Sequence, residues 1–388
     1  MKNIIVYSGS RADYGIIKTL ILKLKKKKIN LKLALGAQHN NSKYNNSLLE
    51  IIKKDKLRCD HIPNFKINKT LPENIVNYSC KTIQYYNKIF SKKKIDLLVL
   101  VGDRYEVFAL AFLAHYLGIK ICHLHGGEVT EGSYDDSARH AITKLSNFHF
   151  VSTDRYKKRV IQLGENPNTV FNIGAPSIEN YKDYVSVFKK EFPELSNDKK
   201  SIIITFHPET ASTLPYKKQI EVFLNALKFS NLKNFNLVFT STNSDTMGNY
   251  FNLKIKKFVK KNKNCFFYKT LGKKKYFTLL ENCKFLVGNS SSGIIEAPCF
   301  NIYTLNIGTR QKSRLFPNSV ISCRLSKSEI VKNVKKILKK TKHNFKNPYF
   351  KKNSSSLMIK HIFSILKYNK KIKAMKFYDS KKKNNFYC

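Results

Sequence analysis

Short apolar runs alternate with longer amphipathic stretches along the chain, and this alternation predicts repeated β–α units. In the first half, the apolar runs that predict strands fall at residues 3–8, 31–37, 96–102, 119–125 and 148–153. Apolar positions at helical spacing lie between them, most clearly in the segment 73–93. Because these strands are apolar on both faces, we expect a parallel sheet that helices cover on both sides.

The same alternation restarts near residue 200. Further strands are predicted within residues 201–210, 235–245, 284–288 and 301–308, with helices over 216–230 and 274–283. Between the two halves, the segment EFPELSNDKK is typical of a linker or surface loop. The expected fold class is α/β, with two Rossmann-like, doubly wound parallel-sheet domains and an interdomain cleft at their carboxyl strand ends. We place the domains at 1–176 and 177–370, with a basic tail at 371–388.

The length of 388 residues, 42% of them hydrophobic, favours two domains over a single core. No stretch approaches the roughly 20 apolar residues that a membrane span needs, and the N-terminal apolar run is too short for a secretory signal. We therefore expect a soluble cytoplasmic protein with no membrane partner. The 8 cysteines form no CxxC pair, which predicts buried thiols rather than disulfides or a zinc site.

The formal net charge of +46 raises the alternative of a nucleic-acid-binding protein. However, the lysines occur as short runs along the whole chain, arginine is scarce, and no nucleic-acid-binding signature is present. This pattern favours a solvated basic surface over a specific nucleic-acid site, with loose binding to polyanions expected at low salt.

Polar clusters follow the predicted strands directly, and in open parallel sheets this edge is where ligands bind. The clusters lie at residues 9–15, 102–106, 123–128, 207–210, 241–245, 288–293 and 308–314. Seven clusters in the same structural position indicate a functional site.

Acidic residues and histidines gather in one stretch of this basic chain, HLHGGEVTEGSYDDSARH at residues 123–140. Its ionisable residues are His123, His125, Glu128, Glu131, Asp135, Asp136, Arg139 and His140. Clustered carboxyl groups push their pKa values apart, so that one can act as a base while another stays protonated, which predicts acid–base chemistry. Asp103, after another predicted strand and next to Arg104, is a further candidate. The alternative for Asp135 and Asp136 is that they cap a helix.

Ser290, Ser291 and Ser292 lie where a strand is expected to give way to a helix N-terminus, whose free backbone N–H groups can hold a phosphate. An ordinary serine N-cap explains them equally simply. Arg310, Arg314 and Arg11 could pair with the same phosphates, although each alone is more often a surface residue. Glu296 could accept hydrogen bonds from ribose hydroxyls, or be a solvated helix carboxylate.

Several cofactor classes find no support in the sequence. There is no GxGxxG for a dinucleotide and no GxxxxGK[ST] for a P-loop. The spacing of His123, His125 and the nearby acids fits no standard set of metal ligands, so we expect no metal and no cofactor.

Eight motifs in order, from about residue 3 to about residue 365, closely resemble the hydrolysing UDP-N-acetylglucosamine 2-epimerases of bacterial sialic-acid-type sugar synthesis. They are GSRADYG, GDRYE, HLHGGEVTEGSYDDSARHAITKLS, STDRYKKRVIQLGE, VFNIGAPS, FHPET, GNSSSGIIEAP and NIGTRQKSR. The resemblance implies a GT-B fold with the nucleotide sugar between its domains, and a reaction of UDP-GlcNAc with water that gives N-acetylmannosamine and UDP without NAD. It also suggests a homodimer or homotetramer.

The resemblance assigns roles to individual residues. Asp103, Glu128 and Asp135 are implied in proton transfer, with Arg139 and His140 supporting them. The expected substrate-binding residues are Arg11, Arg104, His207, Asn243, Asp245, Ser290, Ser291, Ser292, Glu296 and Arg310. Some relatives carry Glu at the position of His125, so either His125 or Glu128 performs that proton transfer here.

Other functions remain as alternatives at this stage. Within the family, the substrate could be a GDP- or UDP-linked 2,4-diacetamido-trideoxy sugar of the legionaminic acid type, because the motif loops are shared. A GT-B glycosyltransferase would share the phosphate-binding groups, but it would need an acceptor site rather than this carboxylate-rich loop.

Overall fold

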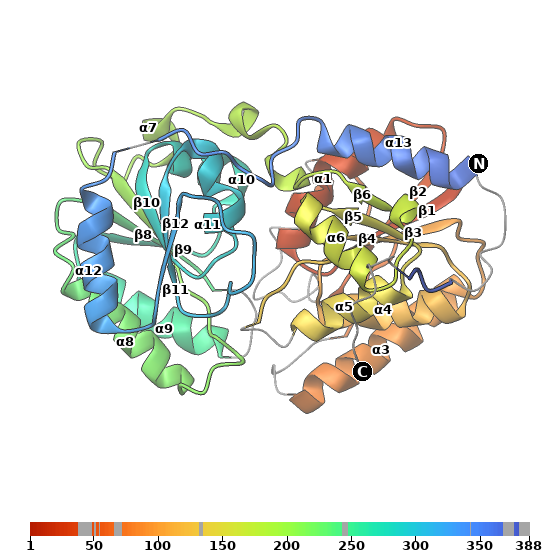
Figure 1. The fold of residues 1–388 in the computed structure, drawn as a ribbon, viewed down its shortest axis with the longest axis horizontal. Helices are drawn as coiled ribbons and strands as arrows, with labels where there is room; N and C mark the ends of the chain where they lie inside the picture. The colour runs from red at the N-terminus through yellow and green to blue at the C-terminus, as the bar shows by residue number, and fades with distance from the viewer. Residues whose placement is uncertain are drawn as a thin grey trace, which may run out of the picture. The chain divides into compact units, whose positions relative to one another are not determined.

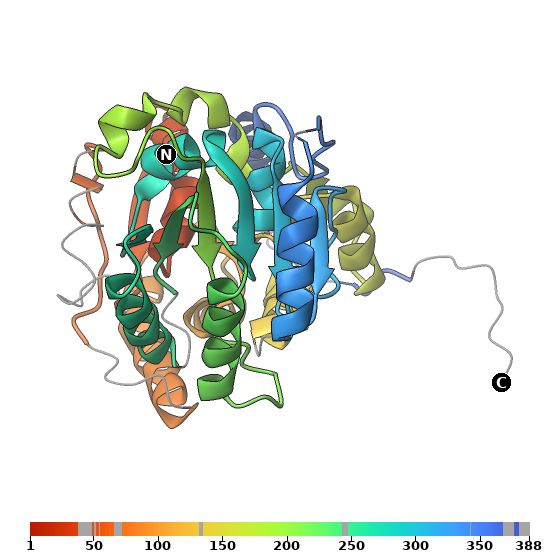
Figure 2. The same ribbon diagram turned by 90° about the vertical axis from the view of Figure 1, so that its left-hand side faces the viewer.

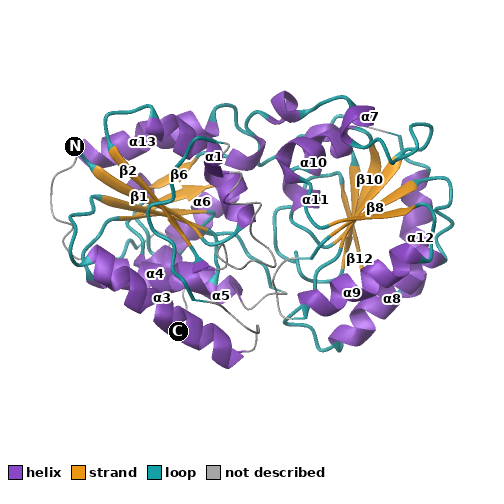
Figure 3. Ribbon diagram, turned by 180° about the vertical axis from the view of Figure 1, so that it is seen from behind, coloured by secondary structure: helices purple, strands orange, loops and turns teal. Residues whose placement is uncertain are grey.

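The computed structural model describes residues 1–37, 49, 52–53, 55–65, 72–131, 135–242, 247–341, 343–367 and 376–379. The chain forms two compact units, each with strands flanked by helices (Figures 1 and 3). The first unit comprises Met1–Glu128, Asp135–Pro176 and Lys351–Cys388, and the second comprises Val129–Tyr134 and Ser177–Phe350. The structure therefore groups residues 351–367 with the first unit, whereas the sequence-based division placed them in the second. Of the predicted tail, only residues 376–379 are described.

The first unit is built on a parallel sheet of six strands in the order β2-β1-β3-β4-β5-β6. The strands are β1 Asn3–Ser8, β2 Asn30–Leu35, β3 Leu97–Val101, β4 Ile121–Leu124, β5 Phe148–Val151 and β6 Val170–Asn172. Ile4 of β1 pairs with Leu31 on one side and Leu97 on the other. Every residue of β3 is buried, as its apolar sequence predicts for a central strand covered on both faces.

Helices cover both faces of this sheet (Figure 1). They are α1 Arg11–Lys25, α3 Pro72–Phe90, α4 Tyr105–Tyr116, α5 Asp135–Leu145, α6 Asp154–Gln162 and α13 Ser354–Lys367. Because side chains alternate along a strand, Ile4 and Val6 belong to the core that includes α1 and α13. Ile5 and Tyr7 belong to the core on the other face, with α3 and α4. This packing is why α13 belongs to the first unit.

The second unit has its own parallel sheet, in the order β12-β11-β10-β7-β8-β9. Its strands are β7 Ser201–Thr205, β8 Asn236–Thr240, β9 Cys265–Tyr268, β10 Cys283–Gly288, β11 Tyr303–Ile307 and β12 Val320–Cys323. Its helices are α7 Phe188–Glu191, α8 Tyr216–Lys228, α9 Gly248–Lys260, α10 Gly272–Glu281, α11 Ser292–Ile295 and α12 Lys327–Leu338. Ile202 and Ile204 pack in one core with side chains of α8, α9 and α12, the last of which is blue in Figure 2. The prediction of two doubly wound parallel-sheet domains is confirmed.

Short 3₁₀ turns complete the described secondary structure, at Pro167–Thr169, Pro176–Ile178, Tyr181–Tyr184 and Ala297–Phe300. None of the described helices is long and apolar enough to cross a membrane. None of the described cysteines forms a disulfide, and Cys122, Cys265, Cys283 and Cys323 are buried as expected. Cys80 is exposed on α3, contrary to the expectation of burial, and Cys388 lies outside the described residues.

Candidate active site

Arg139 of α5 joins the loops that follow β3 and β4, two neighbouring strands of the first sheet. Its Nη2 donates to the carboxylate of Asp103, and its Nη1 donates to the backbone oxygen of His125 at 3.1 Å. The same Nη1 lies 3.8 Å from Oε2 of Glu128. Arg139 is only 3% exposed, so these interactions hold its charge inside the protein. The structure thus gathers three of the predicted catalytic residues around the guanidinium of a fourth.

His125 and Glu128 contact each other directly. Nδ1 of His125 lies 2.8 Å from Oε1 of Glu128, and Oγ of Ser152, after β5, donates to the same oxygen at 3.0 Å. Because a carboxylate accepts, we place a hydrogen on Nδ1 of His125. Nε2 is buried and has no hydrogen-bond partner among the described residues. This arrangement leaves one basic nitrogen for a proton that comes from outside the protein.

The backbone around His125 has an uncommon conformation. His125 has φ +65°, in the left-handed region that non-glycine residues rarely adopt, and Gly127 has φ +75°. A Cβ on Gly127 would lie 2.6 Å from the backbone oxygen of Tyr156, so only glycine fits against α6. Arg159 of α6 donates to the Gly127 oxygen at 2.7 Å. Packing against α6 therefore holds the Gly-Gly turn, and the strained residue lies at the candidate site.

His123 has a structural role. It is fully buried, with Nε2 2.7 Å from the backbone oxygen of Gly102 and Nδ1 3.2 Å from Oγ1 of Thr143. Burial lowers the pKa of His123 to about 3, so the imidazole is neutral. Its neutral ring fixes the residue that precedes Asp103, and it does not serve as an acid or base.

The remaining predicted residues of the 123–140 stretch lie at the start of α5. Asp135 and Asp136 are its first two residues, where the helix dipole favours negative charge. Oδ2 of Asp136 lies 3.6 Å from Nε2 of His140, one helical turn further on. For Asp136, this geometry matches the capping alternative. Proton transfer by Asp135 and support by His140 stay predictions.

Arg104 follows Asp103 in the sequence, but it is not the cation that contacts the Asp103 carboxylate. Arg104 instead donates its Nε to Oε1 of Glu106 at 2.6 Å, while Arg139 of α5 contacts Asp103. Glu106 is completely buried and was not singled out from the sequence. The sequence alone does not show which of two arginines contacts a given carboxylate.

In the second unit, hydrogen bonds tie together the loops after β7, β10 and β11, which are adjacent strands. Asn289 accepts from the His207 backbone N–H at 2.7 Å and donates to the His207 backbone oxygen at 2.8 Å. Gln311 donates to the backbone oxygen of Asn289 at 2.9 Å. Asn289 and Gln311 belong to clusters that the sequence pointed to, but they were not among the chosen residues. They fix the loops that carry the predicted nucleotide-binding groups.

Glu209 holds the loop that contains Arg310 through hydrogen bonds to its backbone. Its Oε1 accepts from the backbone N–H groups of Thr309 at 2.7 Å and Arg310 at 3.0 Å. Gly308 has φ +78°, and a Cβ there would lie 2.1 Å from the same oxygen. The buried carboxylate can approach this closely only because residue 308 is glycine. Glu209 is thus a loop anchor that sequence reasoning missed.

The serine cluster differs from the expected phosphate cradle. Helix α11 has four residues, and its first N–H groups bond locally: Gly293 to the oxygen of Ser290 and Ile294 to that of Ser291. The hydroxyl of Ser292 contacts the Tyr276 hydroxyl, and both Ser292 and Ser177 hydrogen-bond the carboxyl group of Glu296. Burial raises the pKa of Glu296. The expectation of free helix-start N–H groups is wrong at residues 293 and 294, because the tight turn uses them.

Three predicted residues cannot be placed fully. Arg11 is the first residue of α1, but its side chain is outside what the structure describes, and Asn243 and Asp245 lie outside the described residues. Within the described part of the chain, no three His, Cys, Asp or Glu side chains form a group able to hold a metal ion.

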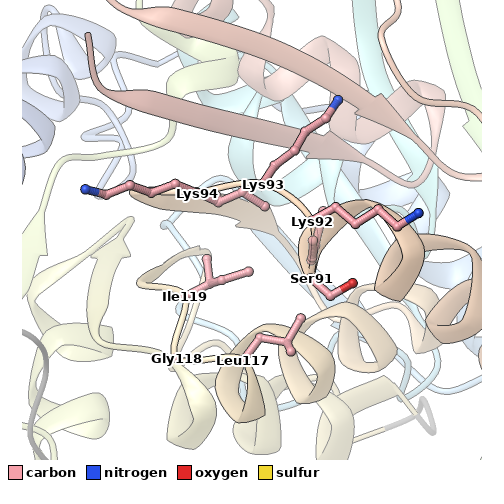
Figure 4. A pocket seen from close by; sticks show the side chains of 9 residues that line it. Ser91, Lys92, Lys93, Lys94, Leu117, Gly118 and Ile119 are labelled. Atoms are coloured by element: carbon pink, nitrogen blue, oxygen red, sulfur yellow. The ribbon is translucent and has the colours of Figure 1, made fainter.

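A hollow in the first unit lies away from these loops. It is lined by residues 90–95, before β3, and 117–119, before β4, at the amino ends of the strands. Figure 4 shows that its Lys92, Lys93 and Lys94 side chains point in three different directions. Their charges do not converge on one anion, so we do not include this hollow in the site.

Comparison with known proteins agrees with the family resemblance. A family model described as UDP-N-acetylglucosamine 2-epimerase matches residues 22–363. Polysialic acid biosynthesis protein P7 of Escherichia coli is 36% identical over 364 residues, covering 91% of this chain and 92% of that protein. The GDP/UDP-N,N'-diacetylbacillosamine 2-epimerase (hydrolyzing) of Campylobacter jejuni is 34% identical over 338 residues, covering 84% and 85%.

The fold also matches solved structures. A crystal structure of UDP-GlcNAc 2-epimerase from Neisseria meningitidis bound to UDP-GlcNAc has a TM-score of 0.79 at 18% identity, covering 94% of this chain and 100% of that one. At this identity the likeness shows the fold, which is GT-B-like with two Rossmann-like domains.

Proposed function

The chain belongs to the UDP-N-acetylglucosamine 2-epimerase family, and we propose that it is a hydrolysing member that converts UDP-GlcNAc and water to N-acetylmannosamine and UDP. The observation that carries the proposal is the group of Asp103, His125, Glu128 and Arg139, in which a histidine is oriented by a buried carboxylate. Such a group can move a proton on a bound sugar.

The proposed reaction has two stages. In the first, a base takes the proton from C2 of the sugar while the C1–O bond to UDP breaks, which gives 2-acetamidoglucal and UDP. In the second, water adds its oxygen to C1 and loses a proton to a base, while an acid returns a proton to C2 on the opposite face. The sum is one water consumed and one inverted centre, with no oxidation.

We assign one proton transfer to Nε2 of His125. Glu128 receives hydrogen bonds from His125 and Ser152, so we assign it the role of orienting the imidazole. Asp103 and Asp135, both partly exposed, are assigned to the remaining proton transfers. Arg139 holds Asp103 and the His125 backbone in place, and His140 supports the start of α5.

The predicted substrate-binding residues keep their proposed roles, and each unit is taken by itself. In the second unit, Arg310, His207 and the serines 290–292 are proposed to contact UDP, with Glu296 at the ribose. In the first unit, Arg11 and Arg104 supply positive charge for the leaving diphosphate. Asn243 and Asp245 keep their predicted place near the nucleotide.

A second candidate substrate is a UDP- or GDP-linked 2,4-diacetamido-trideoxy sugar. The observation that favours it is the 34% identity to the Campylobacter jejuni protein named for N,N'-diacetylbacillosamine. The name of the Escherichia coli relative supports the first candidate and a role in sialic-acid-type sugar biosynthesis. A cytoplasmic location and a homodimer or homotetramer remain part of the proposal.

Turnover of the two substrates separates the candidates. Purified protein is incubated in parallel with UDP-GlcNAc and with UDP-N,N'-diacetylbacillosamine, and UDP and the free sugar are identified by chromatography. The proposal expects UDP and N-acetylmannosamine from the first. Turnover of the second alone assigns the diacetamido sugar. UDP release from neither, together with no GDP release from GDP-N,N'-diacetylbacillosamine, contradicts a hydrolysing epimerase.

A further inference from the structure

A buried ionic cluster lies beside the site, beneath the loops after β1 and β3. Glu106, in the first turn of α4, is completely buried and accepts from Nε of Arg104 at 2.6 Å. Asp13, in the first turn of α1, is 8% exposed and interacts electrostatically with both. A Cβ on Gly9 would lie 2.8 Å from Oε1 of Glu106 and 3.3 Å from Oδ2 of Asp13, so both carboxyl groups approach this glycine.

The cluster is costly to bury and incompletely paired. Oε2 of Glu106 and Oδ2 of Asp13 are buried and have no hydrogen-bond partner among the described residues. A buried ion pair of this kind contributes little to stability compared with apolar packing. Its presence next to the proposed site therefore calls for a reason other than folding.

Burial favours the protonated form of Asp13. Burial raises the pKa of Asp13 to about 7, with Glu106 and Asp103 adding to the effect and Arg104 and Ser10 opposing it. Among the described residues, Glu106 accepts a hydrogen bond from Arg104, whereas Asp13 does not. Glu106, with the direct hydrogen bond, is therefore the carboxylate that holds Arg104.

The pairing leaves one side of Arg104 available. Its side chain is 17% exposed, while that of Glu106 is fully buried. The guanidinium also lies 5.3 Å from the ring centroid of Tyr105, which supports it from a second direction. With Nε donating to Glu106 and Nη2 donating to the Tyr105 hydroxyl at 3.5 Å, Nη1 is the nitrogen left for an anionic or hydroxyl oxygen.

We propose that Glu106 is a positioning residue, which orients the Arg104 guanidinium toward the sugar nucleotide from within the protein. The inference rests on the proposed function, because it takes Arg104 to contact the substrate. In this proposal Glu106 does not contact the substrate, but it sets the orientation of Arg104, which does.

A double-mutant cycle tests this role. The kcat/KM for the sugar nucleotide is measured in wild type, Glu106→Gln, Arg104→Ala and the double variant. Glu106→Gln alone should lose about 100-fold, the cost of misplacing a substrate-positioning group. In the Arg104→Ala background it should add less than about 2-fold. Equal losses in both backgrounds would show that Glu106 acts through the fold and overturn the proposal.

Glu165→Gln is the matched control, because Glu165 is also a buried carboxylate, paired with Lys144 at 2.5 Å and His149 at 3.2 Å. It should keep kcat/KM within about 3-fold once its stability loss is allowed for. If Glu106→Gln fails to fold, Arg104→Lys decides instead: it keeps the charge but not the guanidinium fork. Loss of activity like that of Arg104→Ala supports the proposal, and near-native activity overturns it.

Failure of the proposed function and failure of this inference give different results in the turnover assay. If wild type releases no UDP from any sugar nucleotide tested, the proposed function and this inference both fall. If wild type turns over and only the coupling between Arg104 and Glu106 is absent, the inference alone falls.

Discussion

Nδ1 of His125 lies 2.8 Å from Oε1 of Glu128, so the two residues that sequence analysis left as alternatives form one unit. Their roles follow from the contacts. Glu128 is enclosed by donors, and His125 keeps a buried nitrogen, Nε2, without a partner among the described residues. We therefore treat the imidazole as the group that moves the proton and the carboxylate as its orienting partner.

Substitution of His125 and substitution of Glu128 should lower kcat to different extents. His125→Ala should lower kcat by about 100- to 10,000-fold, because a positioned acid–base group contributes that much. Glu128→Gln should lower it less, since the amide can still accept from Nδ1 with its oxygen. Ser152→Ala, which removes only the second donor to Glu128, is the control and should stay within about 10-fold. A larger loss for Glu128→Gln than for His125→Ala would reverse the assignment.

Arg139 should matter for stability as well as for activity. Arg139→Gln leaves Asp103 and Glu128 without their shared cation in a buried setting, which costs about 3–5 kcal/mol in comparable pairs. Urea denaturation followed by circular dichroism measures the change. Arg155→Gln, at an exposed position of α6, should change the free energy of unfolding by less than about 0.5 kcal/mol. Similar values for both variants would show that Arg139 does not hold the cluster.

Asp13 should make stability depend on pH. Its folded pKa of about 7 lies above the ordinary 3.8, so the folded state binds the proton more tightly. This contribution is fully present below pH 4 and is lost as the pH rises toward and through 7, by at most about 4 kcal/mol. Asp13→Asn should therefore gain stability relative to wild type between pH 4 and pH 8.

Thermal or urea unfolding at several pH values measures this difference. The control is Asp198→Asn, whose carboxylate is exposed to solvent and whose unfolding curve should follow that of wild type. If the stability gap between Asp13→Asn and wild type stays constant from pH 4 to pH 8, Asp13 does not hold a proton in the folded protein.

The loop around Arg310 depends on Gly308. Gly308→Ala forces a side chain into a left-handed backbone and toward Oε1 of Glu209, so it should cost about 1–3 kcal/mol and weaken UDP binding at least about 10-fold. Gly15→Ala is the stability control, because a Cβ there meets nothing within 4 Å and the residue lies inside α1. It should be neutral or stabilising. Calorimetry with UDP and thermal unfolding measure the two effects, and unchanged UDP affinity in Gly308→Ala would separate this loop from the nucleotide site.

Much of the fold could be predicted because its strands are buried on both faces. The predicted strand at 3–8 is β1 Asn3–Ser8 without change, and the helix expected over 216–230 is α8 Tyr216–Lys228. The segment 246–270 received no element, yet it holds α9 and β9. Six of the thirteen residues of α9 are lysine or asparagine, and β9 has only four residues, so the segment resembles a polar connection between elements.

The location of α13 was also not readable from the sequence. It follows α12 along the chain, but Met358 and Ile362 pack in the core of the first sheet. Only tertiary packing decides which of two apolar surfaces a terminal helix covers.

The sequence pointed to candidate residues for the site, but not to the contacts between them. The polar clusters follow strands at the carboxyl edges of the sheets, because parallel strands end on the same side. The pairing of Arg139 with Asp103, the left-handed φ of His125 and the anchoring by Glu209 depend on how separate loops meet. These are properties of three-dimensional packing that residue spacing does not record.

The most direct measurement of the central claim is hydrogen exchange at C2. The protein is incubated with UDP-GlcNAc in deuterated water, and the released sugar is examined by NMR. We predict free N-acetylmannosamine with deuterium at C2, because the proton that returns comes from a group in exchange with solvent. UDP release that leaves the original hydrogen at C2 would contradict the proposed mechanism.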